Sequence, residues 1–425
     1  MARREAISEN ASSGIDVTIV MPCLNEAKSL MACVANARAA LERMRSELGL
    51  SGEVLIADNG SSDGSRELAR ACGARVVEVA RRGYGAALIG GARAARARFI
   101  VMGDADGSYD FCEGVGMVAA LDKGAGLCLG SRFKGEIKPG AMPWKNRYIG
   151  NPVLTFILNL LFKAGVSDAH CGLRAITRTC FDQLGLSGEG MEFASEMIIK
   201  AALKRVIISE VPETLSQDQR ERAPHLRPWR DGWRHLRYLL MLSPTWVFAI
   251  PAALIGLISL AILALAAFDA WIGIGMSAPI GNYWVILAGA MLGVSQISAL
   301  LAAASHLYGV REGYRLQSGW SDRLARFVSL ESMLIIGLAC FLAGFATLFG
   351  VIAYWSSMRF GRIDNVLPAV VGTTLIVLGA QNALGGFLLA ILSGNEAEFL
   401  KEVAPRVEPS FTDASAPRVA DAARR

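Results

Sequence analysis

The chain has 425 residues, of which 53% are hydrophobic, a formal net charge of +5 and a mean hydropathy of +0.37. This length suits two or three domains, and the hydropathy is high for a soluble protein, so we expect membrane spans and, with so modest a charge, no nucleic-acid partner. The eight cysteines include no C-x-x-C pair, which argues against a disulfide framework or a zinc site.

The first half of the chain alternates short apolar runs with helical patterns. Residues 1–14 have no apolar core, so we expect no signal peptide. The apolar runs predict strands at 17–21, 54–57, 75–79, 99–102 and 126–132. Strands that alternate with helices favour βαβ units, so the predicted class is α/β with a mainly parallel sheet. A last strand at 207–213 contains a proline and is expected at an edge of the sheet.

Each of these strands is followed by a polar or glycine-rich turn. In open α/β sheets, ligands bind at the carboxyl ends of the strands. We therefore expect five residues from these turns to converge: Asp58, Gly83, Asp104, Asp106 and Arg132.

Asp104 and Asp106 are two carboxylates one residue apart, directly after an apolar strand. Such a pair suits Mg²⁺ or Mn²⁺ that keeps waters and bridges a diphosphate, although a lone D-x-D can also be a solvated acidic turn. Arg132, together with Arg220 and Arg222, could neutralise the phosphates. Asp58 could accept hydrogen bonds from a base or ribose. The expected ligand is a nucleoside diphosphate joined to another group.

Two nucleotide-binding classes are excluded by missing motifs. The sequence has no G-x-x-x-x-G-K-[ST], so it is not a P-loop NTPase. It also has no G-x-G-x-x-G after the first strand, which removes the dinucleotide fingerprint.

Two segments are candidates for the membrane interface. Residues 151–162 are densely apolar but too short to span a bilayer, so they form either a buried core helix or an interfacial helix. Residues 220–237 are rich in arginine. Their helical pattern places four apolar side chains on one face: Trp229, Trp233, Leu236 and Leu240. A solvated helix is the alternative, but tryptophans beside arginines favour an amphipathic helix on anionic headgroups.

Four later segments are long enough to span a membrane: 246–269, 284–305, 332–354 and 367–392. The segments 220–237 and 306–331 are rich in arginine, whereas 270–283 has no lysine or arginine. The positive-inside rule therefore places the N-terminal domain and the C-terminus in the cytoplasm. The predicted domains are a disordered tail (1–14), an α/β domain (15–218), a basic amphipathic segment (219–244), a four-span domain (245–393) and a disordered tail (394–425).

Six short motifs occur in this order: Met21-Pro22-Cys23-Leu24-Asn25-Glu26, Asp58-Asn59-Gly60-Ser61-Ser62-Asp63-Gly64, Gly83-Tyr84-Gly85, Asp104-Ala105-Asp106, Gly130-Ser131-Arg132 and Cys171-Gly172-Leu173-Arg174. They resemble the family 2 glycosyltransferases, and more closely their polyprenyl-phosphate branch, which includes dolichol-phosphate mannose synthases and bactoprenol glucosyltransferases. The resemblance covers about residues 15–240. It implies a GT-A fold, a nucleotide-sugar donor of the UDP-glucose or GDP-mannose type, and undecaprenyl or dolichyl phosphate as acceptor. It also implies a protein of the bacterial inner-membrane type, and it leaves a homo-oligomer open.

The resemblance also implies functions for individual residues. Substrate contacts fall on Pro22, Asn25, Glu26, Asp58, Asp63, Gly83, Asp104, Arg220 and Arg222. The metal falls on Asp104 and Asp106, and the catalytic set is Asp106, Arg132 and Arg174. Ser108 stands where many relatives have a glutamine as a further metal contact, and the loop at 220–225 also departs from the family pattern.

The implied acceptor predicts a simple mechanism. A phosphate monoester is largely ionised near neutral pH, so it needs no strong general base. We expect in-line displacement with inversion, in which the metal and an arginine stabilise the departing diphosphate. Glu192 and Glu196 lie one helical turn apart and either meet the sugar or form a solvated face. His170 is expected to be structural, because no second ligand lies at metal spacing.

Two other functions are open at this point. One is a processive membrane polysaccharide synthase, but such relatives carry a Gln-x-x-Arg-Trp element and this chain has Leu226-Arg227-Pro228-Trp229. The other is a membrane scaffold whose catalytic domain has decayed. The intact Asp104, Asp106 and Arg132 argue against decay.

Overall fold

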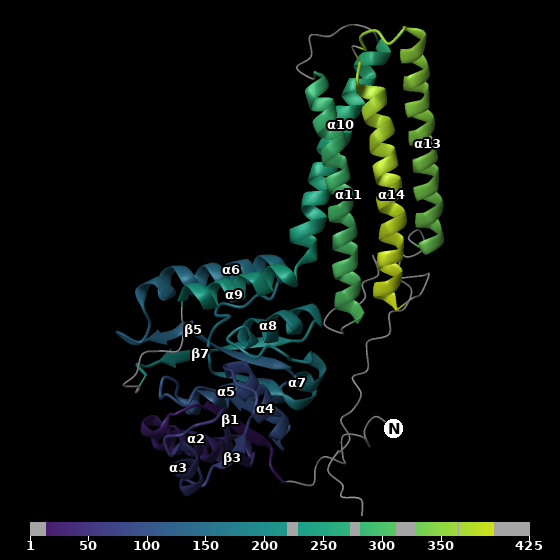
Figure 1. Cartoon of the computed structure of the whole chain (residues 1–425). Helices are drawn as coiled ribbons and strands as arrows, with labels where there is room; N and C mark the ends of the chain where they lie inside the picture. The colour runs from purple at the N-terminus through teal and green to yellow at the C-terminus, as the bar shows by residue number, and fades with distance from the viewer. Residues whose placement is uncertain (1–13, 219–227, 273–280, 312–328, 364, 395–425) are drawn as a thin grey trace, which may run out of the picture.

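The computed structural model describes residues 14–218, 228–272, 281–311, 329–363 and 365–394. An α/β domain is followed by a bundle of four long helices (Figure 1). The change of architecture falls where the sequence becomes mostly apolar.

A seven-stranded sheet forms the centre of the α/β domain, with the order β3-β2-β1-β4-β6-β5-β7. Its strands are β1 (Val17–Cys23), β2 (Gly52–Asp58), β3 (Arg75–Glu78), β4 (Phe99–Met102), β5 (Leu127–Ile137), β6 (Arg174–Thr177) and β7 (Ile208–Leu215). Every neighbouring pair is parallel except those of β6, which is antiparallel to both β4 and β5. The predicted mainly parallel sheet is confirmed, and so is the edge position of β7. The four-residue β6 is not predicted by the sequence.

Helices cover both faces of this sheet. One face carries α2 (Ala27–Leu48), α3 (Ser65–Ala71), the 3₁₀ turn η2 (Phe111–Glu113) and α5 (Gly114–Asp122). The other carries α4 (Tyr84–Ala94), α6 (Asn151–Phe162), α7 (Arg178–Leu184), α8 (Phe193–Leu203) and α9 (Pro228–Met241). The sheet is therefore buried on both sides, which explains why its strands are continuous apolar runs rather than alternating ones.

The four long helices are α10 (Ile250–Ile272), preceded by η4 (Thr245–Ala249), then α11 (Asn282–Arg311), α13 (Leu330–Ser357) and α14 (Leu367–Ser393). All four are long and apolar enough to cross a membrane, so the four predicted spans are confirmed. The backbones of α13 and α14 approach closely at glycines, because a Cβ on Gly337 would lie 2.8 Å from the carbonyl oxygen of Gly379. Small residues allow this kind of close packing between membrane helices.

The helices α6 and α9 pack against each other on the side of the α/β domain nearest the bundle, and they run across the direction of its long helices (Figure 1). α6 buries Leu158 and Phe162 against the domain core, while Phe156 on its other face is 65% exposed. α9 buries Leu239 and exposes Trp233. Each helix thus has one face in the core and an apolar face outside it.

This arrangement bears on both interface predictions. The segment 151–162 is a helix, and it combines a core-facing side with an exposed apolar side. In the basic segment, residues 219–227 and the side chain of Trp229 lie outside the described part of the chain. The exposure of Trp233 and Leu240 agrees with an apolar outer face.

Candidate functional site

The carboxyl ends of β1, β2 and β4 meet at one edge of the sheet. Cys23 at the end of β1 is in register with Asp58 at the end of β2, and Val20 is in register with Met102 at the end of β4. Arg174 pairs with Met102, because the antiparallel β6 begins where β4 ends. The register therefore brings together the turns after β1, β2 and β4. Arg132 differs from the prediction, because it lies inside β5 and not in a turn after it.

The turn after β2 is built around the carboxylate of Asp58. This side chain is only 1% exposed and accepts hydrogen bonds from the backbone N–H groups of Gly60 and Ser61 at 3.1 and 3.2 Å. The side chain of Asn59 reaches the next turn, where its Oδ1 accepts from the N–H of Gly83 at 2.7 Å. Gly83 has no room for a side chain, since a Cβ there would lie 2.1 Å from the carbonyl oxygen of Glu189. The glycine is needed for this close approach.

The turn after β1 fits against the same structure. Asn25 has a positive φ of 57°, and its Oδ1 accepts from the N–H of Ser62 at 2.8 Å. Asp63 accepts from the N–H of Ala27 at 3.0 Å, at the start of α2. Glu26 is 8% exposed. Asn25 and Asp63 thus hold the two turns together, and substrate contact through either remains a prediction, as it does for Pro22 and Glu26.

Asp104 and Asp106 lie in the turn after β4. The Oδ1 atom of Asp106 accepts from the N–H and the hydroxyl of Ser108, at 3.0 and 2.6 Å. The buried hydroxyl of Tyr84 is close enough to Asp104 to sense its charge, and its pKa is raised well above its usual value, first by burial and then by that charge. Tyr84 therefore stays protonated, and Ser108 fixes the carboxylate of Asp106.

These carboxylates fit a divalent cation that shares its coordination with phosphate. Among the described residues, no cluster of three or more His, Cys, Asp or Glu side chains could hold a metal. Mg²⁺ is commonly bound by one or two carboxylates together with phosphate oxygens and waters. Asp104 and Asp106 would supply that protein share. Ser108, at the position of the family glutamine, bonds to Asp106.

Arg132 and Asp168 form a buried ion pair. The Nε and Nη2 atoms of Arg132 lie 2.7 and 2.8 Å from the two carboxylate oxygens of Asp168, and the Arg132 N–H also bonds to it. Burial acts to raise the pKa of Asp168, but the hydrogen bond and charge of Arg132 lower it overall. The sequence prediction assigned a phosphate-binding function to Arg132 and overlooked Asp168.

Arg174 is also buried and bonded to the protein. Its guanidinium donates to the carbonyl oxygens of Cys171 and Ala194, at 2.5 and 3.1 Å from the nearest nitrogens. It thereby ties the start of β6 to the start of α8. A direct catalytic role for Arg174 or Arg132 remains a prediction.

Glu196 is fully buried, so it does not form a solvated face. It pairs with Lys200 at 2.8 Å and accepts from the N–H of Gly188 at 2.7 Å. These contacts hold the loop that covers the start of α4, where the carbonyl oxygen of Glu189 accepts from the N–H of Ala86 at 3.1 Å. Glu192 accepts from the N–H of Gly190 in the same loop.

The loop 167–172 contacts both the carboxylate turn and the helices nearest the bundle. Gly172 donates its N–H to the hydroxyl of Tyr109 at 2.9 Å, and a Cβ on it would lie 2.7 Å from an Asp104 oxygen. At the other end, the Ala169 N–H bonds to Thr155 of α6 at 3.3 Å, and the ring of His170 meets His235 of α9. One short loop therefore joins the site to α6 and α9.

A buried carboxyl group lies beside Arg132 on β7. Glu213 is 1% exposed, and its burial, together with the nearby carboxylate of Glu113, raises its pKa to about 10. It is therefore neutral near pH 7. The sequence gives no signal for this group, because a glutamate in an edge strand is normally expected to face solvent.

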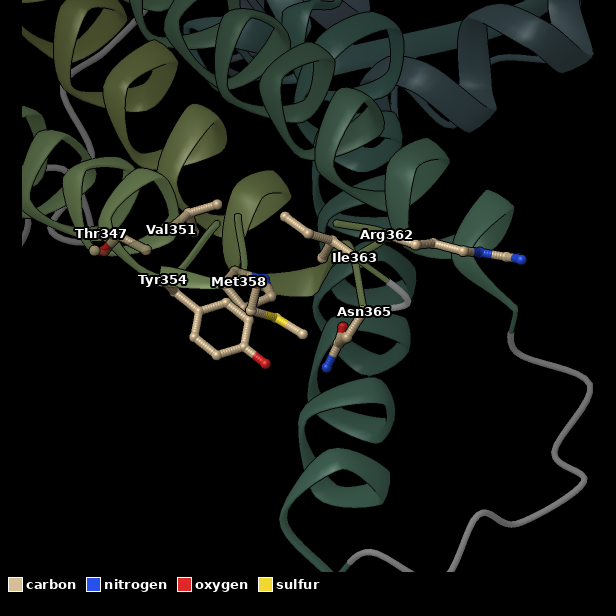
Figure 2. Close-up of a pocket in the computed structure, with 9 residues that line it drawn as sticks. Thr347, Val351, Tyr354, Met358, Arg362, Ile363 and Asn365 are labelled. Atoms are coloured by element: carbon tan, nitrogen blue, oxygen red, sulfur yellow. The ribbon is translucent and has the colours of Figure 1, made fainter. Parts of the chain in front are cut away.

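Two of the predicted substrate contacts and a cavity in the helical bundle lie elsewhere. Arg220 and Arg222 are outside the described residues. A cavity of about 540 Å³ lies at the turn between α13 and α14, at the end of the bundle away from the α/β domain (Figures 1 and 2). Its lining includes Thr347, Tyr354 and Asn365 (Figure 2). This cavity is not part of the strand-end site.

Comparison with known proteins gives a consistent result over both parts of the chain. The model of the family described as Glycosyl transferase family 2 matches residues 18–185. A second, described as Glycosyltransferase family 2 C-terminal transmembrane region, matches residues 303–393. The observed architecture, a mostly parallel α/β domain of the GT-A type followed by four apolar helices, agrees with both matches.

The alignments with three curated relatives cover most of the length of each relative. The low-salt glycan biosynthesis hexosyltransferase Agl6 of Haloferax volcanii is 34% identical over 388 residues, which cover 91% of each chain. The dolichyl-phosphate hexose transferase of the same organism is 29% identical, over 46% of this chain and 81% of its own. The polyprenol monophosphomannose synthase of Mycolicibacterium smegmatis is 27% identical, over 47% of this chain and 77% of its own. The chain therefore belongs to glycosyltransferase family 2 and is an integral membrane glycosyltransferase with the family's C-terminal transmembrane region.

Proposed function

We propose that this protein transfers a hexose from a nucleoside diphosphate sugar to the phosphate of a polyprenyl phosphate, with release of the nucleoside diphosphate. The observation that carries the proposal is the loop 167–172. It joins the Asp104 turn to α6 and α9, which expose apolar faces beside the membrane helices. A site for a charged donor and a surface for a lipid are thus adjacent. Two relatives are named for dolichyl phosphate and polyprenol phosphate products, which supports the same acceptor.

The donor diphosphate would lie at the edge formed by β1, β2 and β4. Asp104 and Asp106 would hold Mg²⁺ or Mn²⁺ there, and the bound ion would neutralise the charge that develops on the departing diphosphate. Ser108 orients the carboxylate of Asp106 by donating a hydrogen bond to it. The buried Asp58 turn would form the wall that faces the nucleoside.

The acceptor would supply its own nucleophile. A phosphate monoester carries about −1.5 to −2 charges near pH 7, so its oxygen can attack the anomeric carbon without a strong base. The contribution of the protein is then to position the phosphate opposite the leaving group, in an environment made positive by arginines. Attack from the side opposite the diphosphate would invert the anomeric centre.

The exposed faces of α6 and α9 would lie in the membrane interface. Ile149, Val153, Phe156 and Leu160 follow one another at helical spacing and are all largely exposed. The charged groups of Lys145 and Arg147 lie over the rings of Trp144 and Tyr148, at 5.8 and 5.5 Å from the ring centroids. Aromatic and basic side chains next to an apolar face are typical of helices that lie on anionic lipid surfaces.

We also propose the membrane orientation and the domain limits from the sequence pattern. The arginine-rich segments 220–237 and 306–331 favour a cytoplasmic α/β domain and C-terminus. The domains would be 15–218 for catalysis, 219–244 for the juxtamembrane segment and 245–393 for the membrane part.

The test is transfer of label into lipid. Purified protein is incubated with undecaprenyl phosphate, Mg²⁺ and a panel of labelled UDP- and GDP-sugars, and the products are extracted into organic solvent. We expect label in the organic phase from one donor, and loss of that label with EDTA. Asp106→Asn should lose transfer, whereas Asp122→Asn, at an exposed position on α5, should retain it.

Other outcomes would assign a different function. Water-soluble polymer from a donor, with no lipid label, would favour the processive polysaccharide synthase. Full biological function of Asp106→Asn in cells would favour a scaffold. Donor hydrolysis without any acceptor product would refute the polyprenyl phosphate acceptor.

A further inference from the structure

His170 carries two polar atoms that the protein itself does not use. Both ring nitrogens are buried and have no hydrogen-bond partner among the described residues. The neighbouring His235 differs, because its Nδ1 lies 2.8 Å from the hydroxyl of Ser195 on α8. The two rings meet edge to face, with centroids 4.8 Å apart. Of these two rings, it is that of His170 whose nitrogens both lack a hydrogen-bond partner among the described residues.

An unfilled imidazole at this depth needs an explanation. Buried polar groups are nearly always hydrogen-bonded, because a group removed from water without a partner loses the free energy of that bond. If the ring served only to pack against His235, a phenyl ring would do so without this cost. The two nitrogens therefore indicate that a further molecule, a ligand or an ordered water, completes the site.

The surroundings of His170 favour an anion. Burial, His235, Arg132 and Arg174 act to lower its pKa and Asp168 acts to raise it; the pKa falls to about 3, so the ring is neutral near pH 7. A neutral imidazole offers one N–H donor and one acceptor. A phosphate monoester presents several acceptor oxygens, and its monoanion also has a donor. The positive charge of the arginines would attract the phosphate, and hydrogen bonds to the imidazole would orient it.

The position of His170 favours the acceptor over the donor. It lies between Asp168, which holds Arg132, and Cys171, whose carbonyl oxygen holds Arg174. Its ring points to α9, and the adjacent Ala169 is bonded to α6. These are the two helices that expose apolar faces beside the bundle (Figure 1). A phosphate attached to a lipid would approach the site from this side.

We propose that His170 contacts the substrate, and that its ring nitrogens hydrogen-bond the phosphate of the lipid acceptor. This inference deepens the proposed function, on which it rests for the identity of the acceptor. It also goes beyond the sequence prediction, in which His170 was structural.

The test compares two phenylalanine variants. His170→Phe keeps the ring against His235 and removes the nitrogens, whereas His235→Phe keeps the same ring contact and leaves His170 intact. We expect His170→Phe to raise the KM for undecaprenyl phosphate at least tenfold, with the KM for the nucleotide sugar changed less than twofold. His235→Phe should leave the acceptor KM within twofold of the wild type. His170→Gln, which retains a donor and an acceptor, should recover part of the loss.

A binding measurement separates this inference from the proposed function. Farnesyl phosphate, farnesol and inorganic phosphate are added to the detergent-solubilised full chain without donor, and the thermal unfolding midpoint is recorded. We expect farnesyl phosphate to raise the midpoint of the wild type and of His235→Phe but not that of His170→Phe, and farnesol to have no effect.

The outcomes are distinct. If the wild type transfers no sugar to undecaprenyl phosphate, the proposed function fails; the inference still stands if the farnesyl phosphate shift depends on His170. An unchanged acceptor KM in His170→Phe, an equal shift in all three proteins or no shift in any would overturn the inference. The same shift with inorganic phosphate would show that the site binds the phosphate group without any contribution from the lipid chain.

Discussion

Arg132 and Asp168 are joined by two parallel hydrogen bonds, at 2.7 and 2.8 Å, inside the domain and 36 residues apart in the chain. Arg132 lies in β5, where the pairing with β7 is interrupted between Ser131 and Glu136. Asp168 lies in the loop 167–172, which contacts α6 and α9. The pair therefore fixes the position of that loop relative to the sheet.

Removal of the Asp168 carboxylate should lower the stability of the folded protein. Asp168→Asn leaves the buried guanidinium of Arg132 without its counter-charge, and breaking a buried pair from one side costs about 3–5 kcal/mol. We expect a loss of that order in the free energy of unfolding, measured by denaturation in detergent. The matched control is Asp182→Asn, whose carboxylate is largely exposed at 3.9 Å from Arg178 and should cost less than about 0.5 kcal/mol. Equal effects of the two variants would contradict this account.

Ser108 should affect the metal through Asp106. Its hydroxyl donates to Asp106 at 2.6 Å, and groups that orient a metal ligand typically change metal affinity about 10–100-fold when removed. We expect Ser108→Ala to raise the Mg²⁺ concentration for half-maximal transfer by about tenfold. Ser46→Ala on the exposed surface of α2 serves as the control. An unchanged Mg²⁺ dependence would show that Ser108 does not support the metal site.

Gly172 should tolerate no side chain. A Cβ at this position would lie 2.7 Å from Asp104 Oδ2 and 2.7 Å from the ring of Tyr109, so one of them must move. Displacement of a catalytic group by about 1 Å can cost about 100-fold in rate. We expect Gly172→Ala to lose at least tenfold in kcat/KM while the chain remains folded. Gly116→Ala on α5, where the nearest atom lies 3.8 Å away, should retain full activity.

Glu213 should make the domain less stable as the pH rises. Its pKa is raised to about 10 in the folded protein, so above the ordinary value of about 4.5 the unfolded chain releases a proton that the folded chain retains. The stability contributed by this group therefore falls as pH rises from about 4.5 to about 10 and is greatest below that window. We expect Glu213→Gln to raise the unfolding midpoint more at pH 8 than at pH 5.

The control for this pH dependence is Glu136→Gln, an exposed position on the neighbouring strand. It should leave the difference between the two pH values unchanged. A gain of about 2–4 °C at pH 8 would correspond to about 1 kcal/mol in a domain of this size. The same midpoint difference in wild type and Glu213→Gln would show that Glu213 is not held neutral.

The sequence by itself determined the larger organisation of this protein. Strand-length apolar runs that alternate with helices predicted the parallel sheet, and runs of more than twenty apolar residues predicted the four spans, because both patterns follow from local geometry and burial. The D-x-D at a strand end predicted the location of the site, since parallel strands end at the same edge. Asp58 was identified for the same reason, whereas Ser108 was identified only because the family it resembles has a glutamine at this position.

Only the tertiary structure decided which side chains these groups meet. Nothing near Arg132 in the chain shows that Asp168 will hold it, and nothing near His170 shows that His235 will pack on it, because both contacts depend on how distant elements are packed. The four-residue β6 was missed because its place between β4 and β5 comes from sheet pairing and not from its own pattern. The burial of Glu196 and Glu213 likewise depends on the helices and strands around them, since a carboxylate is identical in the sequence whether it lies in water or in the core.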